Sequence, residues 1–266
     1  MNPLQTVTYY LTHKPEFTGE DGHAKLLVGL KKHLPLIAGP LVGIDVGSCV
    51  GDYLPHMYAL CNEPHAQILC FEPNPVNIQV LEPKVSSLPH VKLFKHCLSN
   101  ETTTTSFYNW KFNKTNDPGN AIAGLRSGGS KICDVEVKCL QDVLDQECPN
   151  ATIKFIKIDT EGNDSNVLKG FANYLPRTQC IIFECSDCLD DLRGPGIKNP
   201  MKDVVDFLSA HGFDTYRIGT KKLLKVNDDY WNQTYEDVKF WSNCFALPKK
   251  DGLIHQLIHD NFDYTY

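Results

Sequence analysis

Two acidic side chains stand where apolar segments of this chain end, and both have the chemistry to hold a small polar ligand. Asp45 lies in the run LVGIDVGSCVG, residues 41–51, and Glu72 closes the next apolar run, AQILCFEP. Each run is typical of a buried strand that ends in a carboxylate. Because ligands of an open parallel sheet bind where its strands end, we expect Asp45, Gly47, Gly51 and Glu72 to surround one crevice.

The two acids narrow the choice of ligand for such a crevice. A dinucleotide site needs the pattern G-x-G-x-x-G around a pyrophosphate, which the 41–51 run lacks, and a carboxylate at Asp45 would repel that group. S-adenosylmethionine carries a sulfonium, an ammonium and a ribose diol. One acid can serve its amino-acid end while the other accepts hydrogen bonds from both ribose hydroxyls. The residues therefore favour this methyl donor, and the structural alternative is two solvated strand ends.

A second group of charges follows a later apolar run. The segment FIKIDTEG, residues 155–162, places Lys157, Asp159 and Glu161 at the end of a strand. A strand buried on both faces has no structural use for three charges, so pairing or function must offset their burial. The structural alternative is an ion pair between Lys157 and Glu161, with Asp159 capping the next helix. We favour the functional interpretation.

The segments that position these residues alternate between strand and helix patterns. Besides the strand that begins at Leu41, strands are expected at 67–72, 90–98, 153–159, 177–185, 213–218 and 240–247, and helices at 23–34, 51–61, 76–81, 163–174 and 201–211. This alternation predicts an α/β fold, a doubly wound Rossmann-like sheet that is mostly parallel with an antiparallel edge strand.

The alternation is interrupted at about residues 102–140. Segments 102–110 and 133–140 alternate between apolar and polar residues, as an inserted strand pair would, and a polar, glycine-rich loop lies between them. A loop of this length is usually functional or mobile, so we expect it to cover the substrate. The predicted organisation is a helical lead-in over residues 1–40 and a single domain over residues 41–266 that contains the insertion.

Composition limits the partners. The 266 residues are 42% hydrophobic and 22% charged, as in a folded protein, with a formal net charge of −6. The lysines and arginines are scattered, which disfavours nucleic acid because its phosphates require clustered positive charge. No run is long enough to span a membrane. The eleven cysteines lie mostly in apolar runs and no apolar leader precedes them, so we expect a reducing, cytoplasmic location.

Five motifs follow one another along the chain. They are IDVG with Gly51, FEPNP, CLQDVL, KIDTEG followed by VLKG, and IIFE, between residues 44 and 184. In order and spacing they resemble the FkbM-type family of S-adenosylmethionine-dependent methyltransferases. The resemblance implies a class I methyltransferase fold and methyl transfer to a hydroxyl, often on a sugar or a natural product.

The chain departs from this family at Ser48 and Cys49, where such proteins usually carry alanine and asparagine. The asparagine would give the methionine end of the donor a hydrogen bond, which Ser48 can replace.

The resemblance and the strand-end acids together give each residue a role. The expected donor-binding set holds the methionyl part, the ribose and the adenine in turn: Asp45, Gly47, Ser48, Gly51, Glu72, Pro73, Cys97, Leu98 and Asp159. Asp159 is also the expected base that removes the proton of the acceptor hydroxyl, with Lys157 and Glu161 setting its charge environment. Glu184 and His96 are the alternative bases.

The acceptor is expected to be a small molecule or a carbohydrate. The candidates for binding it are Tyr230, Trp231, Tyr235 and the 116–130 loop, which contains Arg126. No metal is expected, although a divalent ion between Asp159 and Asp187 is an alternative.

Two rival functions remain open at this stage. An RNA ribose 2′-O-methyltransferase needs a Lys-Asp-Lys-Glu set whose glutamate lies near the end of the chain. Glu184 comes too early for this role, and Glu236 is the later candidate. A catalytically silent Rossmann-like binding or scaffold module would use the glycine turn only as a tight corner.

Overall fold

The computed structural model describes residues 2–17, 20–109, 123–125, 129–184, 200–237, 242–250 and 252–265. Most of the 116–130 loop, including Arg126, and Asp187 lie outside these residues. The chain divides into two compact units, one with Met1–Leu36 and the described residues from Gln179 onward, the other with Ile37–Thr178. No helix in the described ranges is long and apolar enough to cross a membrane.

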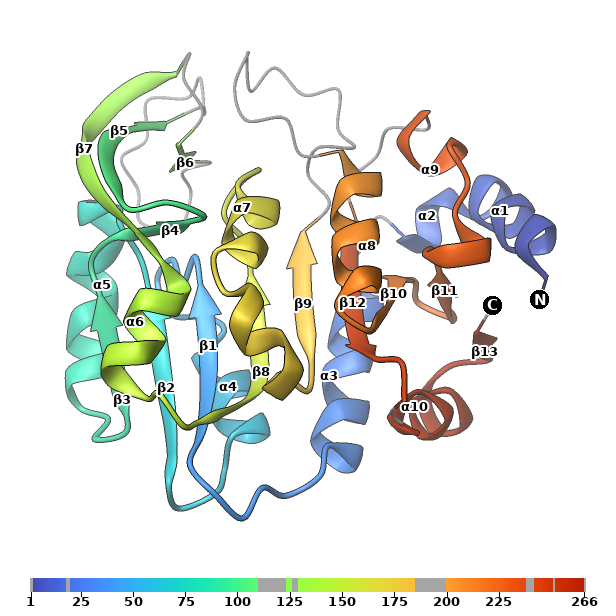
Figure 1. Cartoon of the computed structure of the whole chain (residues 1–266), viewed down its shortest axis with the longest axis horizontal. Helices are drawn as coiled ribbons and strands as arrows, with labels where there is room; N and C mark the ends of the chain where they lie inside the picture. Colours follow the sequence, from blue (N-terminus) through green and yellow to red (C-terminus); the bar gives the residue numbers. More distant parts are fainter. Residues whose placement is uncertain are drawn as a thin grey trace. The chain divides into compact units, whose positions relative to one another are not determined.

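The Ile37–Thr178 unit is built on parallel strands in the order β8-β1-β2-β3 (Figure 1). These strands are β8 (Thr152–Ile158), β1 (Leu41–Val46), β2 (Ala66–Phe71) and β3 (Val91–Phe94). The register places Asp45 of β1 between Cys70 of β2 and Lys157 of β8. The first acid and the lysine of the later motif are therefore direct neighbours across two strands, which the sequence alone does not show.

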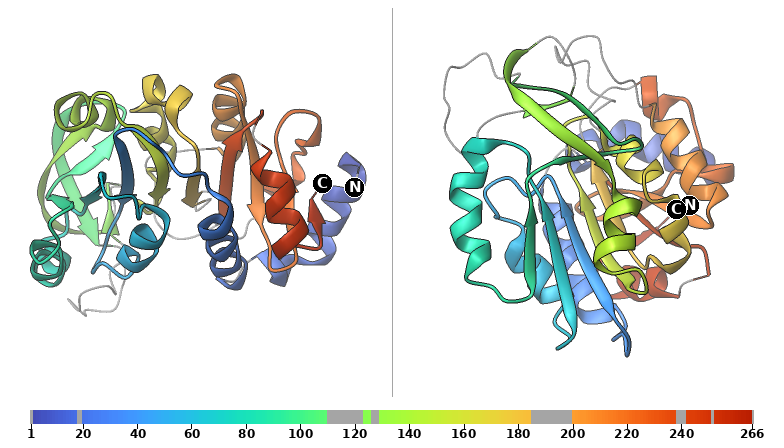
Figure 2. Two further views of the ribbon diagram at one scale, coloured as in Figure 1. Left: turned by 90° about the horizontal axis from the view of Figure 1, so that it is seen from below. Right: turned by 60° about the vertical axis from the view of Figure 1, so that its left-hand side comes forward.

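Helices cover both faces of these strands, which confirms the doubly wound arrangement (Figure 2). On one side lie α4 (Leu54–Leu60) and α5 (Pro75–Ser86), each with a proline in its first turn, where no backbone N–H is lost from the helix. On the other side lie α6 (Leu140–Glu147), α7 (Asp164–Lys169) and the 3-10 helix η1 (Ala172–Arg177). The helix expected at 163–174 is thus two short ones, because Gly170 ends α7.

The insertion forms a second sheet of four strands in the order β4-β7-β5-β6. They are β4 (Cys97–Ser99), β7 (Ser130–Cys139), β5 (Thr103–Asn109) and β6 (Ala123–Gly124). The expected strand pair is confirmed as β5 and β7, which are antiparallel. The expectation of one strand at 90–98 was wrong, because the chain leaves the first sheet after β3 and β4 pairs with β7 instead.

The other unit holds mostly antiparallel strands in the order β13-β11-β10-β12-β9. Its elements are α1 (Pro3–Thr12), α2 (Lys14–Phe17), α3 (Asp21–His33), β9 (Ile181–Glu184), α8 (Met201–Ala210), β10 (Phe213–Ile218), β11 (Lys222–Lys225), η3 (Asp228–Tyr230), α9 (Thr234–Asp237), β12 (Asn243–Pro248), α10 (Leu253–Asn261) and β13 (Tyr264–Thr265). The mixed α/β class is confirmed, but antiparallel pairing extends over several strands rather than one edge strand. A short turn between β10 and β11 leaves no room for the crossover that parallel pairing needs.

A buried ion pair fixes the start of β8, the strand that carries the second motif. Lys154 Nζ lies 2.5 Å from Glu63 Oε1, and both side chains are at most 5% exposed. Glu63 Oε1 also accepts a hydrogen bond from the Ile37 backbone N–H at 3.2 Å. The pair therefore ties β8 to the segment after α4 and to the chain entering β1.

Replacing Lys154 with methionine leaves the Glu63 carboxylate buried without its cation. We expect the free energy of unfolding to fall by about 3–5 kcal/mol, measured by urea denaturation. Lys92→Met is the control, because the Lys92–Glu147 pair is 53% and 28% exposed and should be worth about 1 kcal/mol or less. Equal losses in the two variants would contradict the anchoring role.

Candidate functional site

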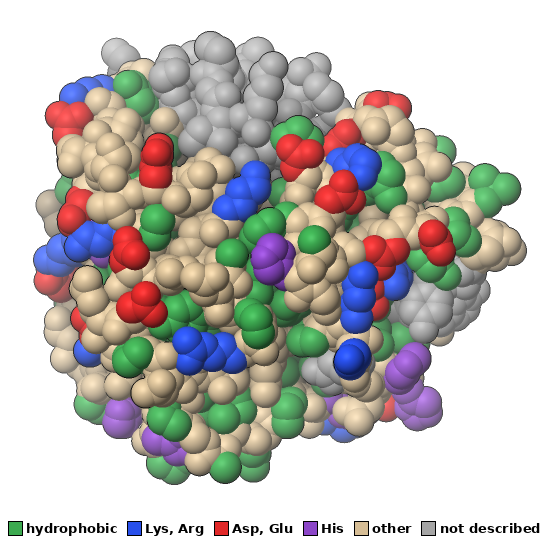
Figure 3. Space-filling model, in the orientation of Figure 1, with side chains coloured by type: hydrophobic (Ala, Val, Ile, Leu, Met, Phe, Trp, Pro, Cys, Tyr) green, Lys and Arg blue, Asp and Glu red, His purple; other side chains and the backbone are tan. Residues whose placement is uncertain are grey.

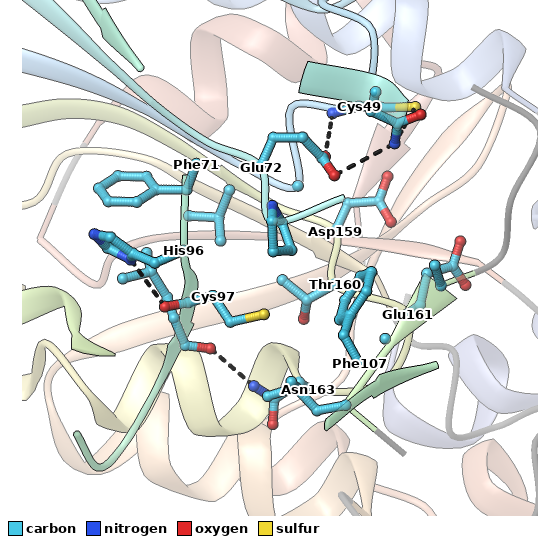
Figure 4. A pocket seen from close by; sticks show the side chains of 18 residues that line it. Cys49, Phe71, Glu72, His96, Cys97, Phe107, Asp159, Thr160, Glu161 and Asn163 are labelled. Atoms are coloured by element: carbon cyan, nitrogen blue, oxygen red, sulfur yellow. Dashed lines mark hydrogen bonds between the residues drawn. The ribbon is translucent and has the colours of Figure 1, made fainter. Parts of the chain in front are cut away.

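A cavity lies within the Ile37–Thr178 unit, where β1, β2 and β8 end (Figure 4). Its described walls come from the turn after β1, the segment after β2, the segment that contains β4, the loop after β8, and strands β5 and β6 of the second sheet. The carboxyl edge of the parallel strands is thus the location of the cavity, as the sequence predicts.

The backbone N–H groups of the turn after β1 donate hydrogen bonds to other groups of the protein. Gly47 and Ser48 both donate to the Phe71 carbonyl at 3.0 Å, and Cys49 donates to Glu72 Oε2 at 2.7 Å. A pyrophosphate cradle would instead need such N–H groups aimed at the ligand. The geometry therefore agrees with the sequence analysis, which argues against a dinucleotide-binding site.

Gly47 is the position of this turn where a side chain would not fit. Its φ is +77°, and a Cβ built on it would lie 1.9 Å from the Asp159 carbonyl oxygen. The Asp159 backbone N–H in turn donates to the Val46 carbonyl at 3.0 Å. The ends of β1 and β8 therefore touch through their backbones at this glycine.

Glu72 is buried and held by three hydrogen bonds from the protein. Besides Cys49, the Asn74 backbone N–H donates to Oε1 at 2.9 Å and Asn77 Nδ2 donates to the same oxygen at 3.3 Å. Burial raises the pKa of Glu72 to about 7, and these hydrogen bonds limit the rise. A carboxylate has about four acceptor sites, so these three hydrogen bonds leave room for one further donor, such as a ribose hydroxyl.

Lys157 joins the two acidic motifs. Its Nζ donates to the Gly47 carbonyl at 2.9 Å and lies 3.3 Å from Asp159 Oδ2 and 3.6 Å from Asp45 Oδ1. Burial alone would lower the pKa of Lys157, but the charges of Asp159 and Asp45 outweigh it and raise that pKa, so the ammonium stays protonated. Burial also raises the pKa of the fully buried Asp45, against the opposing effect of Lys157.

Asp159 is the more accessible carboxylate of the cavity, with its side chain 44% exposed. It does not cap the next helix, because Asn163 occupies the N-cap position of α7. Asp164 Oδ2 accepts hydrogen bonds from the Thr160 N–H and Oγ1, at 3.2 and 2.8 Å. Glu161 follows with φ +56°, a conformation that side chains rarely adopt, and also lines the cavity. Strain of this kind is typical of functional loops.

The segment that contains β4 forms an apolar wall that also has fixed polar contacts. Asn163 Nδ2 donates to the Leu98 carbonyl at 2.9 Å, which ties this wall to the loop after β8. His96 Nδ1 lies 3.0 Å from the Cys97 carbonyl, and burial lowers the pKa of His96, so its ring is neutral. The ring packs beside Phe71, with centroids 5.5 Å apart.

Comparison with known proteins identifies the family. The sequence profile of the methyltransferase FkbM domain matches residues 45–215. The chain belongs to this family. Methyltransferase sdnD from Sordaria araneosa is 33% identical over 154 residues, which cover 48% of this chain and 59% of that protein. The chain therefore spans about three fifths of the length of that curated relative.

Solved structures resemble the FkbM chain more distantly. The methyltransferase FkbM from Methylobacillus flagellatus is 10% identical, with a TM-score of 0.46, over 91% of this chain and 59% of that one. An S-adenosylmethionine-dependent methyltransferase from Aquifex aeolicus is 14% identical, with a TM-score of 0.40, over 93% of this chain and 99% of that one.

The family implies S-adenosylmethionine as the methyl donor, and the described cavity of this FkbM domain suits it. Glu72 offers an oriented acceptor for the ribose diol. Asp45 and Asp159 share one lysine, and Asp159 and Glu161 place two acidic side chains on the cavity wall, which suits a ligand with a positive sulfonium. The polar and apolar walls match a ligand that combines an amino acid, a sugar and a base.

The FkbM cavity brings together most, but not all, of the residues singled out from the sequence. Its lining includes Gly47, Glu72, Pro73, Cys97, Leu98, Asp159 and Glu161. Asp45, Ser48, Gly51 and Lys157 stand behind this lining, and the Ser48 hydroxyl donates to the Asp45 carbonyl at 2.9 Å. Glu184, Tyr230, Trp231, Tyr235 and Glu236 belong to the other unit.

Sequence reasoning missed several lining residues of the FkbM cavity, among them Asn77 and Phe107. Asn77 had a usable signal, since it lies in the first turn of the helix that follows Glu72 and so starts at the same sheet edge. Phe107 had none, because its direction depends on the pairing of the inserted strands.

Substituting alanine for Gly47 should both strain and displace the turn. Gly212 is the matched control, since it has φ +84° but nothing within 4 Å of a built Cβ. We expect Gly212→Ala to cost about 1–2 kcal/mol of unfolding free energy, the price of the left-handed conformation alone. Gly47→Ala should cost more than this and weaken donor binding, as measured by denaturation and calorimetry. Equal costs would mean that the contact with Asp159 does not constrain the turn.

Proposed function

We propose that this FkbM-family chain is an S-adenosylmethionine-dependent O-methyltransferase that acts on a hydroxyl of a sugar, a glycan or a small metabolite. The observation that carries the proposal is the unequal environment of two carboxylates in one cavity. Glu72 is buried and receives three protein hydrogen bonds, whereas the Asp159 side chain is 44% exposed. Carboxylates in such different surroundings are suited to different roles.

Glu72 suits donor binding because its orientation is fixed before any ligand arrives. Its three donors come from the turn after β1, the start of α5 and the side chain of Asn77. The remaining acceptor site would take a ribose hydroxyl, and bonds to an ionised acceptor are the stronger kind. The residue therefore acts as a preformed clamp rather than as a proton carrier.

Asp159 suits the chemical step because it is accessible from the cavity and anchored from behind. When bound, the donor would supply a methyl group on a positively charged sulfur. A nucleophilic oxygen can bond to that methyl carbon while the sulfur leaves as a neutral thioether. Lys157 holds Asp159 Oδ2 at 3.3 Å, which leaves Oδ1 to take the proton of the acceptor hydroxyl as the carbon–oxygen bond forms. Holding the reacting groups in line supplies several kcal/mol of the barrier reduction.

Lys157 has a positioning role in this proposal. It contacts Asp159, Asp45 and the carbonyl of Gly47 at once, so the base and the donor turn share one anchor. Glu161 adds a second carboxylate at the cavity wall, in a strained conformation.

The distribution of surface charge gives no support to an RNA acceptor. On the face shown in Figure 3, lysine and arginine side chains are interspersed with acidic ones rather than gathered in a stripe. The described lining residues include the acidic side chains of Glu72, Asp159 and Glu161 and no lysine or arginine. Phosphate binding calls for the opposite charge. A cytoplasmic location is part of the same proposal.

The first experiment is a methyl-transfer screen with labelled donor against sugars, glycolipids, small hydroxylated metabolites and capped RNA. Transfer to a hydroxyl of the first three classes supports the proposal. Transfer to RNA alone would favour the ribose 2′-O-methyltransferase, and calorimetry without any binding of S-adenosylhomocysteine would favour a silent module.

Glu72→Gln removes the charge of the clamp while keeping its shape. We expect the affinity for S-adenosylhomocysteine to fall roughly 10- to 150-fold by calorimetry, the loss of about 1.5–3 kcal/mol from hydrogen bonds to a charged acceptor. Glu82→Gln on α5, whose side chain is 49% exposed and pairs with Lys95, is the control and should bind normally. Unchanged affinity in Glu72→Gln would remove the ribose role.

The same clamp predicts a pH dependence of donor binding. The pKa of Glu72 is raised to about 7, so its ionised fraction, which accepts a ribose hydroxyl, grows as pH rises through neutrality. The affinity for S-adenosylhomocysteine should therefore rise between about pH 6 and pH 8 in the wild type, because Glu72 no longer has to lose a proton before it accepts the ribose hydroxyl. In Glu72→Gln the rise should be absent.

Asp159→Asn removes the base but keeps the carbonyl oxygen near Lys157. In a single-turnover assay on the acceptor found in the screen, we expect methyl transfer to slow by about 10²–10⁴-fold. Donor affinity should fall less than in Glu72→Gln, since the Glu72 clamp is untouched. Glu161→Gln is the companion variant, and a near-normal rate for Asp159→Asn with a large loss for Glu161→Gln would move the base to Glu161.

A further inference from the structure

The second sheet contributes side chains to the same cavity as the donor clamp. Phe107 of β5, Ala123 and Gly124 of β6, and the adjacent Leu125 all line it. These residues come from the insertion, whose loop the sequence predicts to cover the substrate. Their surroundings give β5 a different role.

Phe107 is packed against the wall formed by β4. It is 4% exposed and belongs to one buried cluster with Cys97, Val135 and Val137, the apolar core of the second sheet. Cys97 also lines the cavity, in the segment expected beside the adenine. The ring of Phe107 is therefore fixed by the protein, and Figure 4 shows it among the side chains around the cavity.

Strand β6 closes the cavity against the loop after β8. A Cβ built on Gly124 would lie 3.4 Å from the Thr160 carbonyl oxygen and 3.5 Å from that of Glu161, which is ordinary van der Waals contact. The second sheet and the strained turn at Glu161 therefore meet at this glycine. Together they bound one continuous cavity whose walls include Glu72 and Phe107.

The chemistry of the donor connects these observations. Adenine is a flat, largely apolar ring attached directly to the ribose that Glu72 would hold, so it must occupy the same cavity. The apolar lining available in the described residues consists mainly of Phe71, Pro73, Cys97, Leu98, Phe107 and Leu125. Two of these, Phe71 and Phe107, are aromatic rings on strands. Phe71 is stacked on Phe94, with centroids 4.9 Å apart, so Phe107 offers the ring on which a nucleobase would stack.

We infer that Phe107 is a donor-binding residue, and that strand β5 of the second sheet covers the adenine of S-adenosylmethionine. The inference rests on the proposed function and adds a residue that neither the strand-end acids nor the sequence motifs indicate. It assigns β5 to the donor, whereas the sequence-based expectation places only the loop between the inserted strands over the substrate.

The test is calorimetric binding of S-adenosylhomocysteine and of adenosine to the full-length Phe107→Ala variant. Loss of one stacking contact is worth about 1–3 kcal/mol, so both ligands should bind roughly 5- to 150-fold more weakly, by a similar factor. Adenosine lacks the amino-acid end, so an equal loss locates the contact at the nucleoside. Wild-type affinity of Phe107→Ala for both ligands would overturn the inference.

Val135→Ala is the matched control. Val135 belongs to the same buried cluster but does not line the cavity. This variant should lower the unfolding temperature and leave ligand affinity within about twofold, since its cavity wall is intact. An equal loss of affinity in Val135→Ala would show that Phe107 acts only through the stability of the second sheet.

A second variant keeps the test decisive if Phe107→Ala does not fold. Phe107→Leu retains an apolar side chain for the core and removes the ring, and it should still weaken both ligands by several-fold. Normal binding in Phe107→Leu would contradict a stacking role. Failure of the wild type to bind S-adenosylhomocysteine would instead reject the proposed function, so the two hypotheses fail separately.

Discussion

The site depends on one ammonium group that three acceptors share. Lys157 meets the Gly47 carbonyl, Asp45 and Asp159 within 3.6 Å, and the register of β1 against β8 places it there. Asp45 is completely buried, and an uncompensated carboxylate at such a position would cost several kcal/mol. Without the lysine, the two acids would also repel each other across the strands. The turn after β1 and the Asp159 carboxylate are thus held by a single charge.

The acids at this sheet edge gain their separate properties from their hydrogen-bond partners. Glu72 and Asp159 both follow strands and both reach the cavity, yet Glu72 is enclosed by donors while Asp159 faces one cation and solvent. A strand end therefore decides where a carboxylate stands, and the neighbouring loops decide what it can do. The same division explains why Asp45, although it ends a strand, lies behind the cavity wall.

Local patterns in the sequence were enough to predict the strand-end acids and the alternation of strands and helices, because buried parallel strands are continuous apolar runs and their ends coincide at one edge. The family and its donor were predicted from the resemblance of five motifs to FkbM-type methyltransferases. The contact of Lys157 with Asp45 was not predictable, since it depends on which strands are neighbours. Residues 90–98 look like one strand, but their division between two sheets depends on β7, about 40 residues later. The inward direction of Phe107 depends on the same distant pairing.

Strand β4 has its described strand partner only in residues Val137–Cys139 of β7. During synthesis the chain has therefore made both donor-side acids and the first three parallel strands before the partner of β4 exists. The wall beside Cys97 and Leu98 can assemble only after the whole insertion has been completed and has folded back. Closing a loop of this length is slow relative to the local βα units. Competence to bind the nucleoside should thus come later in the folding of this unit than the pairing of β1, β2 and β3.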